Sequence, residues 1–291
     1  MESPVDSDLP VADVPVARLR KLARPRVRLV AIDLDGTLLD SSKRVSERTL
    51  ETIAQASEMG AKIVIASARP PRSVRAIYRQ LGLDSLQINY NGAMVWDEPR
   101  ARTVFHCPIR GSVALKMIET ARDLFEEVCV TCEILDRWHT DREEQLYTTE
   151  TGKLFKPDVI APFEQVCLED VTKLMFLGDP RTMSRLEATL LARFGQQVTI
   201  LHTDRDLLQI MDRRVSKGVT LKKVAGHYGV RMAEVMAIGD APNDVGMLKV
   251  AGVAVAMDNA HVLVKDIAHF VAPSNDDHGV SAAIRKYVLG E

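Results

Sequence analysis

The chain has 291 residues, of which 46% are hydrophobic and 27% charged, with a formal net charge of −2. This length suits one large or two modest globular domains, and the near-zero charge excludes an overall basic surface of the kind that holds nucleic acid or an anionic membrane. No apolar run approaches the roughly 20 residues needed to span a bilayer. We therefore expect a cytoplasmic protein, a monomer or small homo-oligomer, whose partner is a small molecule and neither nucleic acid nor membrane.

Residues 1–25 are rich in Pro, Asp and Arg. They lack the apolar stretch of a secretory signal peptide and contain too many acidic residues for a typical transit peptide. We expect a disordered tail that takes no part in the fold.

An apolar run, Leu29 to Ile32, predicts the first buried strand, and acidic side chains follow it directly. Asp33 and Asp35 come next, followed by Gly36 and Thr37. Ligands bind beyond the carboxyl ends of the strands in an open parallel sheet, so chemistry is expected here. An Asp-x-Asp pair alone is also common in solvated turns, and it gains meaning only if other residues converge on the same place.

The next segments alternate between helix and strand. Ser46 is expected to cap a helix, the β-branched run 62–66 predicts a second strand that ends in Ser67-Ala68-Arg69, and Pro71 lies at the start of another helix. A short strand at 87–89 and a β-hairpin follow. This order predicts right-handed crossovers and a parallel sheet covered by helices.

The pattern changes between about residues 108 and 211. The sequence there predicts a helix, several strands between 127 and 147, a strand at 172–177, a second helix and two more strands at 198–202 and 207–211. Because strands and helices no longer alternate singly, we expect a separate α+β insertion of about 100 residues, a sensible size for a domain.

Two of the four cysteines, Cys129 and Cys132, form a Cys-x-x-Cys pair. This spacing occurs in zinc and redox sites. Here the surrounding apolar residues predict a strand, in which positions three apart point to opposite faces and cannot share a ligand. We therefore expect buried thiols rather than a metal site. His139 is expected on an exposed hairpin surface.

The strand-helix alternation resumes after the insertion. Ser216-Lys217-Gly218 begins a helix, and the apolar strand 235–238 ends in Gly239-Asp240, with Pro242-Asn243-Asp244 starting the next helix. A further strand, 253–257, ends in Asp258 and Asn259. Carboxylates thus recur at the ends of strands that should share one edge of the sheet.

These residue types suit phosphoryl transfer. Asp33, Asp35 and Asp240 offer the hard oxygen ligands that Mg²⁺ prefers, and a cation would relieve the repulsion among them. An aspartate nucleophile such as Asp33 can take up the phosphoryl group, while Asp35 protonates the leaving alcohol and then deprotonates water. Ser67 and Lys217 would hold the phosphate and stabilise its transition-state charge.

Four motifs in this order resemble those of the haloacid dehalogenase-like hydrolases: residues 33–38, 67–69, 216–218 and 239–244. Three further stretches, Asn91-Gly92-Ala93, 256–260 and 275–280, narrow the resemblance to Cof-type phosphatases, which carry an α/β cap inserted between the second and third motifs. The resemblance spans roughly residues 27 to 288.

The resemblance implies a role for each matching residue and Mg²⁺ as the cofactor. Asp33 would be the nucleophile and a metal ligand, Asp35 the acid/base and a metal ligand through its backbone carbonyl, and Asp240 the third protein ligand. Asp244 would support these ligands without binding the metal directly, or would bind it through a water molecule. The implied phosphate-binding residues are Ser67, Ala68, Lys217 and Asn243.

Two positions depart from the usual pattern of that family. Ser67-Ala68-Arg69 stands where Thr-Gly-Arg is common; Ser keeps the hydroxyl, whereas Ala68 narrows the backbone conformations of the loop. Asp258 replaces a common Gly, which puts an extra acid near the site or on its rim. Arg69 is expected to orient a loop through a salt bridge rather than to touch the substrate.

We therefore predict an α/β protein with a doubly wound, Rossmann-like core of parallel strands, residues 26–107 and 212–291, and an inserted α+β cap domain, residues 108–211. Its expected activity is Mg²⁺-dependent hydrolysis of a small phosphate monoester, a sugar phosphate or related metabolite, through an aspartyl-phosphate.

Other functions remain open from the sequence. A phosphomutase or phosphotransferase would use the same intermediate but pass the phosphoryl group to a second sugar. A non-catalytic sensor of a phosphorylated metabolite would bind without turnover. A metal-dependent glycosyltransferase also uses Asp-x-Asp, but it gives Lys217, Asp240 and Asp244 no clear purpose.

Overall fold

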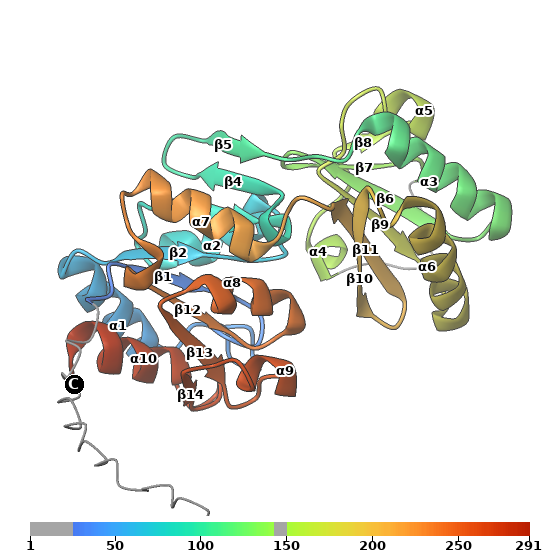
Figure 1. Cartoon of the computed structure of the whole chain (residues 1–291). Coiled ribbons are helices and arrows are strands. Elements are labelled where there is room, and N and C mark those ends of the chain that lie inside the picture. Colours follow the sequence, from blue (N-terminus) through green and yellow to red (C-terminus); the bar gives the residue numbers. More distant parts are fainter. Residues whose placement is uncertain (1–25, 143–149) are drawn as a thin grey trace, which may run out of the picture.

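The computed structural model describes residues 26–142 and 150–291. The predicted tail, residues 1–25, lies outside the described residues, as does the end of the strand region expected between 127 and 147. Figure 1 shows two lobes, each built around its own sheet. Among the described residues, no helix is both long and apolar enough to cross a membrane.

The first lobe is built from two stretches of the chain. Its strands are β1 (Leu29–Ile32), β2 (Lys62–Ile65), β3 (Gln87–Asn89), β4 (Met94–Asp97), β5 (Arg102–His106), β12 (Val235–Gly239), β13 (Val253–Met257) and β14 (Phe270–Ala272). Its α-helices are α1 (Glu47–Glu58), α2 (Pro71–Gln80), α7 (Lys217–His227), α8 (Val245–Val250), α9 (Val262–Lys265) and α10 (Gly279–Ile284).

The second lobe is built from the continuous stretch between β5 and α7. Its strands are β6 (Cys129–Ile134), β7 (Arg137–Thr140), β8 (Val159–Ile160), β9 (Lys173–Leu177), β10 (Val198–Asp204) and β11 (Leu207–Asp212). Its helices are α3 (Gly111–Leu124), α4 (Glu150–Leu154), α5 (Phe163–Val166) and α6 (Pro180–Phe194).

The main sheet of the first lobe is parallel, with strand order β14-β13-β12-β1-β2. In the centre, Ile32 of β1 pairs with Ile238 of β12 on one side and with Ile65 of β2 on the other. The residues that follow these three strands therefore meet at one edge of the sheet. The predicted doubly wound α/β architecture is confirmed, and the register explains why Asp33, Ser67 and Asp240 come together.

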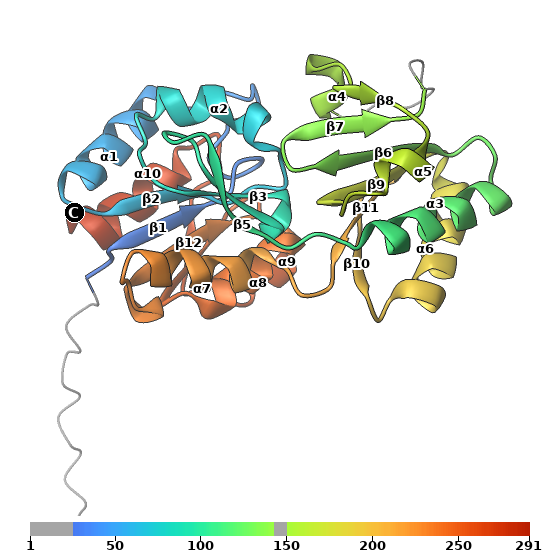
Figure 2. The same ribbon diagram turned by 90° about the horizontal axis from the view of Figure 1, so that it is seen from above.

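Both faces of this sheet are buried, which is why its strands are continuous apolar runs. Alternate residues of β1 divide between two cores: Val30 and Ile32 pack with α1, α2 and α10, whereas Leu29 and Ala31 pack with α7, α8 and α9. Figure 2 shows these two helical layers on opposite sides of the sheet. Ser46 caps α1 through its side chain, as predicted, and Ser216 caps α7, whose start the sequence also indicated.

A small antiparallel sheet, β3-β4-β5, extends the first lobe. It contains the predicted hairpin, in which Asp97 pairs with Arg102. A single parallel bridge between Ala66 and Ile88 joins this sheet to the end of β2. A tight turn, Tyr90–Gly92, follows β3 directly. The small sheet thus carries that turn to the edge where the main strands end.

The second lobe has a six-stranded sheet with order β10-β11-β9-β6-β7-β8. Its pairs are antiparallel except for β7 and β8. Helices α3, α5 and α6 pack on one face and bury the apolar core of this lobe (Figure 2). The sequence did not indicate α4, β8 or α5, which are all five residues or shorter. The predicted domain limits, with a cap at 108–211, fit this arrangement but stay a prediction.

The sequence expectation for His139 was wrong, whereas the expected burial of Cys129 and Cys132 is confirmed. The short strand β8 pairs with β7 and converts it from an edge strand into an inner one, so that His139 is only 5% exposed. Burial lowers the pKa of His139. The two cysteines lie on β6 as buried free thiols.

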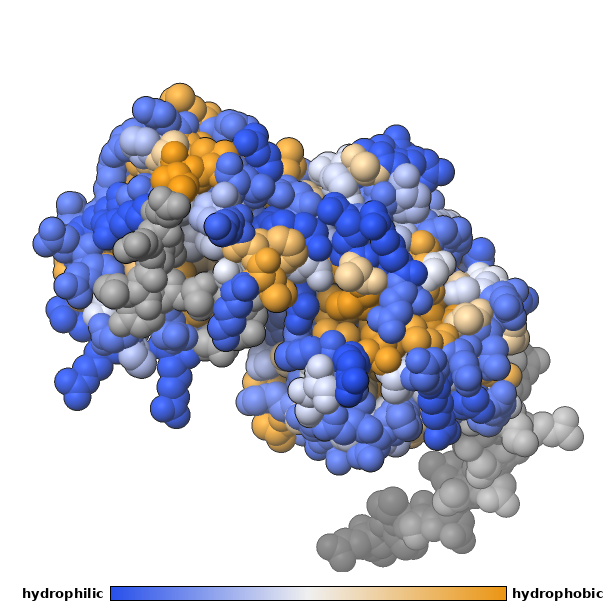
Figure 3. Space-filling view, turned by 180° about the vertical axis from the view of Figure 1, so that it is seen from behind, coloured by the Kyte–Doolittle hydropathy of each residue, from blue (hydrophilic) through white to orange (hydrophobic). Residues whose placement is uncertain are grey.

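The two lobes meet through a buried polar junction. The guanidinium of Arg72, on α2, makes two hydrogen bonds to the carboxylate of Glu133 on β6, at 2.6 and 2.9 Å. The Tyr90 hydroxyl donates to the carbonyl of Leu135 at 2.7 Å, and Lys173 Nζ lies 3.5 Å from the carbonyl of Ala68. Figure 3 shows the two lobes from behind, with a notch between them.

Replacing Arg72 tests the strength of this junction. We expect Arg72→Met to lower the free energy of unfolding by about 3 kcal/mol, because removing one partner of a buried ion pair leaves the other charge uncompensated. The double variant Arg72→Met/Glu133→Leu should recover most of that loss in urea denaturation.

Arg79→Met is the matched control. Arg79 lies on the same helix, its side chain is 72% exposed, and its ion pair with Glu98 at 3.8 Å stays within the first lobe, so its removal should cost less than about 1 kcal/mol. Equal losses in Arg72→Met and Arg79→Met would show that the buried pair does not hold the lobes together.

Candidate active site

A buried lysine links two of the predicted acidic residues. Lys217, the first residue of α7, is completely shielded from solvent, and its Nζ donates to Asp33 and, at 2.7 Å, to Asp244 Oδ1. Burial alone would lower the pKa of Lys217, but the charges of Asp244 and Asp33 outweigh it and raise the pKa above its usual value. Lys217 is therefore a fixed cation at the end of β1.

Three carboxylates form a cluster around this lysine. Asp33, Asp240 and Asp244 each offer an oxygen, and these oxygens lie within 4.8 Å of one another. Burial, opposed by Lys217 and reinforced by the charges of Asp244 and Asp240, raises the pKa of Asp33 well above its ordinary value. Burial and the charge of Asp244 raise the pKa of Asp240 to about 6. One lysine thus leaves the cluster with excess negative charge.

The donor set fits a hard divalent cation. All three residues supply carboxylate oxygens, which Mg²⁺ prefers, and the raised pKa values of Asp33 and Asp240 show that the cluster favours added positive charge. Asp244 is suited to an indirect role, because its Oδ1 accepts from Lys217 and its Oδ2 accepts from the backbone N–H groups of Asp240 and Ala241, both at 3.1 Å.

The turn after Asp33 is shaped to fit against Asp240. Gly36 has a φ of +79°, and a Cβ placed on it would lie 2.4 Å from Asp240 Oδ2. A side chain at this position would therefore collide with the carboxylate and strain the backbone. The next residue, Thr37, donates from Oγ1 to Asp240 Oδ1 at 2.7 Å. Gly36 and Thr37 together fix the rotamer of Asp240.

The carboxylate of Asp35 points away from the cluster. It accepts from Arg69 Nε at 2.7 Å and from Lys43 Nζ at 2.8 Å. Burial would raise the pKa of Asp35, but the hydrogen bonds and charges of Arg69 and Lys43 together lower it. The expectation that Arg69 forms a salt bridge is confirmed; that its partner is Asp35, 34 residues away, could not be read from the sequence.

The predicted phosphate-binding loop follows β2. Ser67 is buried, and its Oγ accepts from the N–H of Arg69 at 3.1 Å. Ala68 does not have the left-handed backbone that would favour the glycine found more commonly there, so this departure causes no strain. The carbonyl of Ala68 faces the second lobe, where it receives the contact from Lys173.

Asn243 lies in the short turn Pro242–Asp244, which precedes α8, and donates from Nδ2 to Asn91 Oδ1 at 2.9 Å.

By contrast, Asp258 takes no part in the cluster. Its side chain is exposed and pairs with Lys265 at 3.3 Å, so the extra acid lies at the surface. The structure therefore brings together most of the predicted site residues and leaves Asp258 outside.

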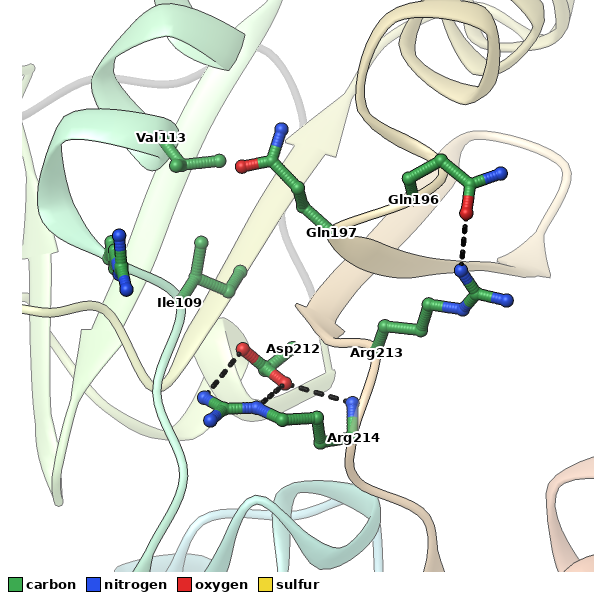
Figure 4. A pocket seen from close by; sticks show the side chains of 8 residues that line it. Ile109, Val113, Gln196, Gln197, Asp212, Arg213 and Arg214 are labelled. Carbon is green, nitrogen blue, oxygen red and sulfur yellow. Dashed lines mark hydrogen bonds and ion pairs between the residues drawn. The ribbon is translucent and has the colours of Figure 1, made fainter.

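A cavity of about 540 Å³ lies at a different place, between the two chain segments that connect the lobes. Its lining combines Ile109 and Arg110, before α3, with Asp212, the last residue of β11, and Arg213 and Arg214, which follow it. In Figure 4 the Asp212 carboxylate accepts from Arg214, and Arg213 donates to Gln196. None of the predicted site residues lines this cavity.

Residues 30–284 match the family described as haloacid dehalogenase-like hydrolase. Phosphatase YwpJ of Bacillus subtilis is 29% identical over 289 residues, covering 90% of this chain and all of that protein. The 5-amino-6-(5-phospho-D-ribitylamino)uracil phosphatase YitU of the same organism is 27% identical, covering 89% of this chain and 97% of that protein.

A solved structure shows the same fold. The crystal structure of a haloacid dehalogenase-like hydrolase from Bacteroides thetaiotaomicron superposes with a TM-score of 0.82 at 26% identity, covering 90% of this chain and 99% of that one. The family match and the names of these relatives support a phosphatase.

Asp240→Asn tests the charge balance of the cluster. We expect the metal-free variant to unfold at a higher temperature than the wild type at pH 7, because one repelling carboxylate is gone. The folded-state pKa of Asp240, about 6, exceeds its ordinary 3.8, so the folded state binds more protons and wild-type stability falls as pH rises through this window. The advantage of the variant should therefore grow between about pH 4 and 6.

Addition of Mg²⁺ should reverse the order of the two unfolding temperatures, so that the wild type becomes the more stable protein. We expect Mg²⁺ to raise the unfolding temperature of the wild type and to have little effect on Asp240→Asn, as measured by calorimetry. Asp258→Asn removes an exposed carboxylate and should behave as the wild type. A Mg²⁺ response that survives in Asp240→Asn would place the cation elsewhere.

Proposed function

This chain belongs to the haloacid dehalogenase-like hydrolases of the Cof type, and we propose that it is a Mg²⁺-dependent phosphatase that hydrolyses small phosphate monoesters through a phosphorylated Asp33. The observation that carries this proposal is the buried Lys217 held between Asp33 and Asp244 at the end of β1. A fixed cation beside a carboxylate is the arrangement that a negatively charged phosphoryl group requires.

In the first step, a carboxylate oxygen of Asp33 attacks phosphorus and the bond to the leaving alcohol breaks. Lys217 and the amide of Asn243, together with the Ser67 hydroxyl, would bind the oxygens of the phosphoryl group. Ala68 would contribute its backbone N–H. The product of this step is the phosphorylated Asp33 and a free alcohol.

Asp35 would move the protons in both steps. In its protonated form it gives a proton to the departing alcohol oxygen, and as the carboxylate it then takes one from the water that attacks the phosphorylated Asp33. That attack releases inorganic phosphate and restores Asp33. The ion pairs of Asp35 with Arg69 and Lys43 stabilise its carboxylate form, which is the form that takes the proton from water in the second step.

Mg²⁺ held by the carboxylates of Asp33 and Asp240 and the backbone carbonyl of Asp35 would neutralise charge on the phosphate oxygens. Asp244 would orient this set rather than join it, since its two oxygens already bind Lys217 and the backbone of Asp240. Thr37 would keep Asp240 in place through its hydroxyl.

We propose a sugar phosphate or a related small metabolite as the substrate. The second lobe is proposed to act as a cap, residues 108–211, that excludes bulk water and selects the leaving group. This proposal is supported by the position of the second lobe, which contacts the Ser67–Arg69 loop through Lys173. A lobe docked this close to the loop leaves little room for a polymeric substrate.

The first test is phosphate release from a panel of sugar phosphates, nucleotides and cofactor phosphates. We expect turnover by the wild type that EDTA abolishes and Mg²⁺ restores. Asp33→Asn should lower the rate by more than about 10⁴-fold, the scale on which removing a nucleophile acts. Asp258→Asn should retain wild-type turnover.

Products distinguish the alternatives. Transfer of the phosphoryl group to an added sugar in place of water would favour a mutase or phosphotransferase. If the protein binds members of the panel but neither hydrolyses them nor transfers their phosphoryl group, a sensor would be favoured and the proposed hydrolysis overturned.

Asp35→Asn tests the acid role through the leaving group. We expect the variant to lose far more activity with an alkyl phosphate than with p-nitrophenyl phosphate, because the nitrophenolate departs without a proton. The comparison is the ratio of kcat/KM values for the two substrates. An equal loss with both would assign Asp35 a structural role.

A further inference from the structure

The turn Tyr90–Gly92 has an unusual backbone. Its three successive residues have positive φ angles of 51°, 55° and 106°. Only Gly adopts such angles without cost, and an Asn does so more readily than a Tyr. Strained segments of this kind persist where the surrounding structure holds them, and they cluster at functional sites.

The surroundings of this turn are the elements that carry the proposed phosphate-binding residues. The N–H of Asn91 donates to the carbonyl of Ser67 at 3.0 Å. The carbonyl of Gly92 accepts from Thr220 Oγ1, on α7, at 2.7 Å, and a Cβ on Gly92 would lie 2.5 Å from the carbonyl of Ser216. The turn therefore packs between the Ser67 loop and the start of the helix that carries Lys217.

The side chain of Asn91 completes this arrangement on a third side. It is only 4% exposed, and its Oδ1 accepts from Asn243 Nδ2. Its own Nδ2 is buried and has no hydrogen-bond partner among the described residues. A buried amide donor left unpaired carries a desolvation penalty, and such a group calls for an explanation.

We propose that Asn91 is a further phosphate-positioning residue: its Oδ1 holds the amide of Asn243, and its Nδ2 donates to an oxygen of the bound phosphate. This inference rests on the proposed function for the identity of the ligand. Asn91 makes direct hydrogen bonds to Ser67 and Asn243, and the adjacent Gly92 contacts α7, the helix that begins with Lys217. The unpaired donor of Asn91 therefore belongs to the region where those three residues would meet the phosphate.

The simpler explanation is that Asn91 serves only the turn, because Asn tolerates a left-handed backbone. Glycine tolerates it better, since it has no Cβ. Asn91→Gly therefore removes the amide without straining the backbone. If the turn alone mattered, this variant would lose nothing.

The experiment measures binding of inorganic phosphate by calorimetry in the presence of Mg²⁺. We expect Asn91→Gly to bind phosphate at least about tenfold more weakly, the loss that one hydrogen bond to a charged group implies. Asn91→Asp keeps an acceptor for Asn243 but faces the anion with a carboxylate, so it should bind more weakly still. A role confined to the turn predicts wild-type affinity in Asn91→Gly, and this variant decides between the two explanations.

Ala101→Gly is the matched control, because Ala101 also has a positive φ, of 47°, but lies in the β4–β5 hairpin. It should bind phosphate as the wild type does. The unfolding temperature of each variant reports whether the fold is intact.

A double-mutant cycle with Asn243→Ala separates the two roles of Asn91. We expect Asn91→Gly to weaken phosphate binding at least about threefold further in the Asn243→Ala background, because the hydrogen bond from Nδ2 is lost there too, but by less than in the wild type, because no Asn243 amide remains to be held. A double variant that binds phosphate as Asn243→Ala does would show that Asn91 acts only by holding Asn243 and would overturn the direct contact with phosphate. Wild-type affinity in Asn91→Gly would overturn the inference as a whole, as would a wild type that binds no phosphate.

These outcomes separate the inference from the proposed function. If the wild type binds phosphate but hydrolyses none of the panel, hydrolysis fails while the order of affinities among the Asn91 variants still tests the inference. If hydrolysis occurs and Asn91→Gly binds phosphate normally, the inference fails and the phosphatase stands.

Discussion

The contact on which the site depends is the ammonium of Lys217 buried between Asp33 and Asp244. These three residues come from the first strand, the third motif and the fourth, and only a parallel sheet brings them to one edge. Burying one of these charges alone would be unfavourable, so their pairing makes the fold and the site mutually dependent. One cation among three carboxylates still leaves an excess of negative charge, which could be balanced by a metal ion.

Much of the first lobe could be predicted because its signals are local. Apolar runs marked the central strands, Ser46 and Ser216 marked helix starts, and polar residues after each strand marked the edge where they would meet. Short elements carry no such periodicity. The two residues of β8 were therefore missed, and with them the burial of His139 on the neighbouring strand.

The contacts within the site were predictable only in part. Motifs located Asp33, Lys217 and Asp240, but side-chain partners far apart in sequence leave no local pattern. The pairing of Asp35 with Arg69 and of Asn91 with Asn243 follows from how loops at the sheet edge fold onto each other. The sequence identified the residues and the structure assigned their partners.

The cavity in Figure 4 has a consequence for how the protein can change. Both connecting segments line this cavity, so the chain enters and leaves the second lobe at neighbouring points. A segment whose two ends lie together can be exchanged for another without rethreading the sheet that carries Asp33. In the proposed function the chemistry belongs to the core and the choice of substrate to the insert, so exchanging the insert alone would change the specificity and leave the chemistry in place.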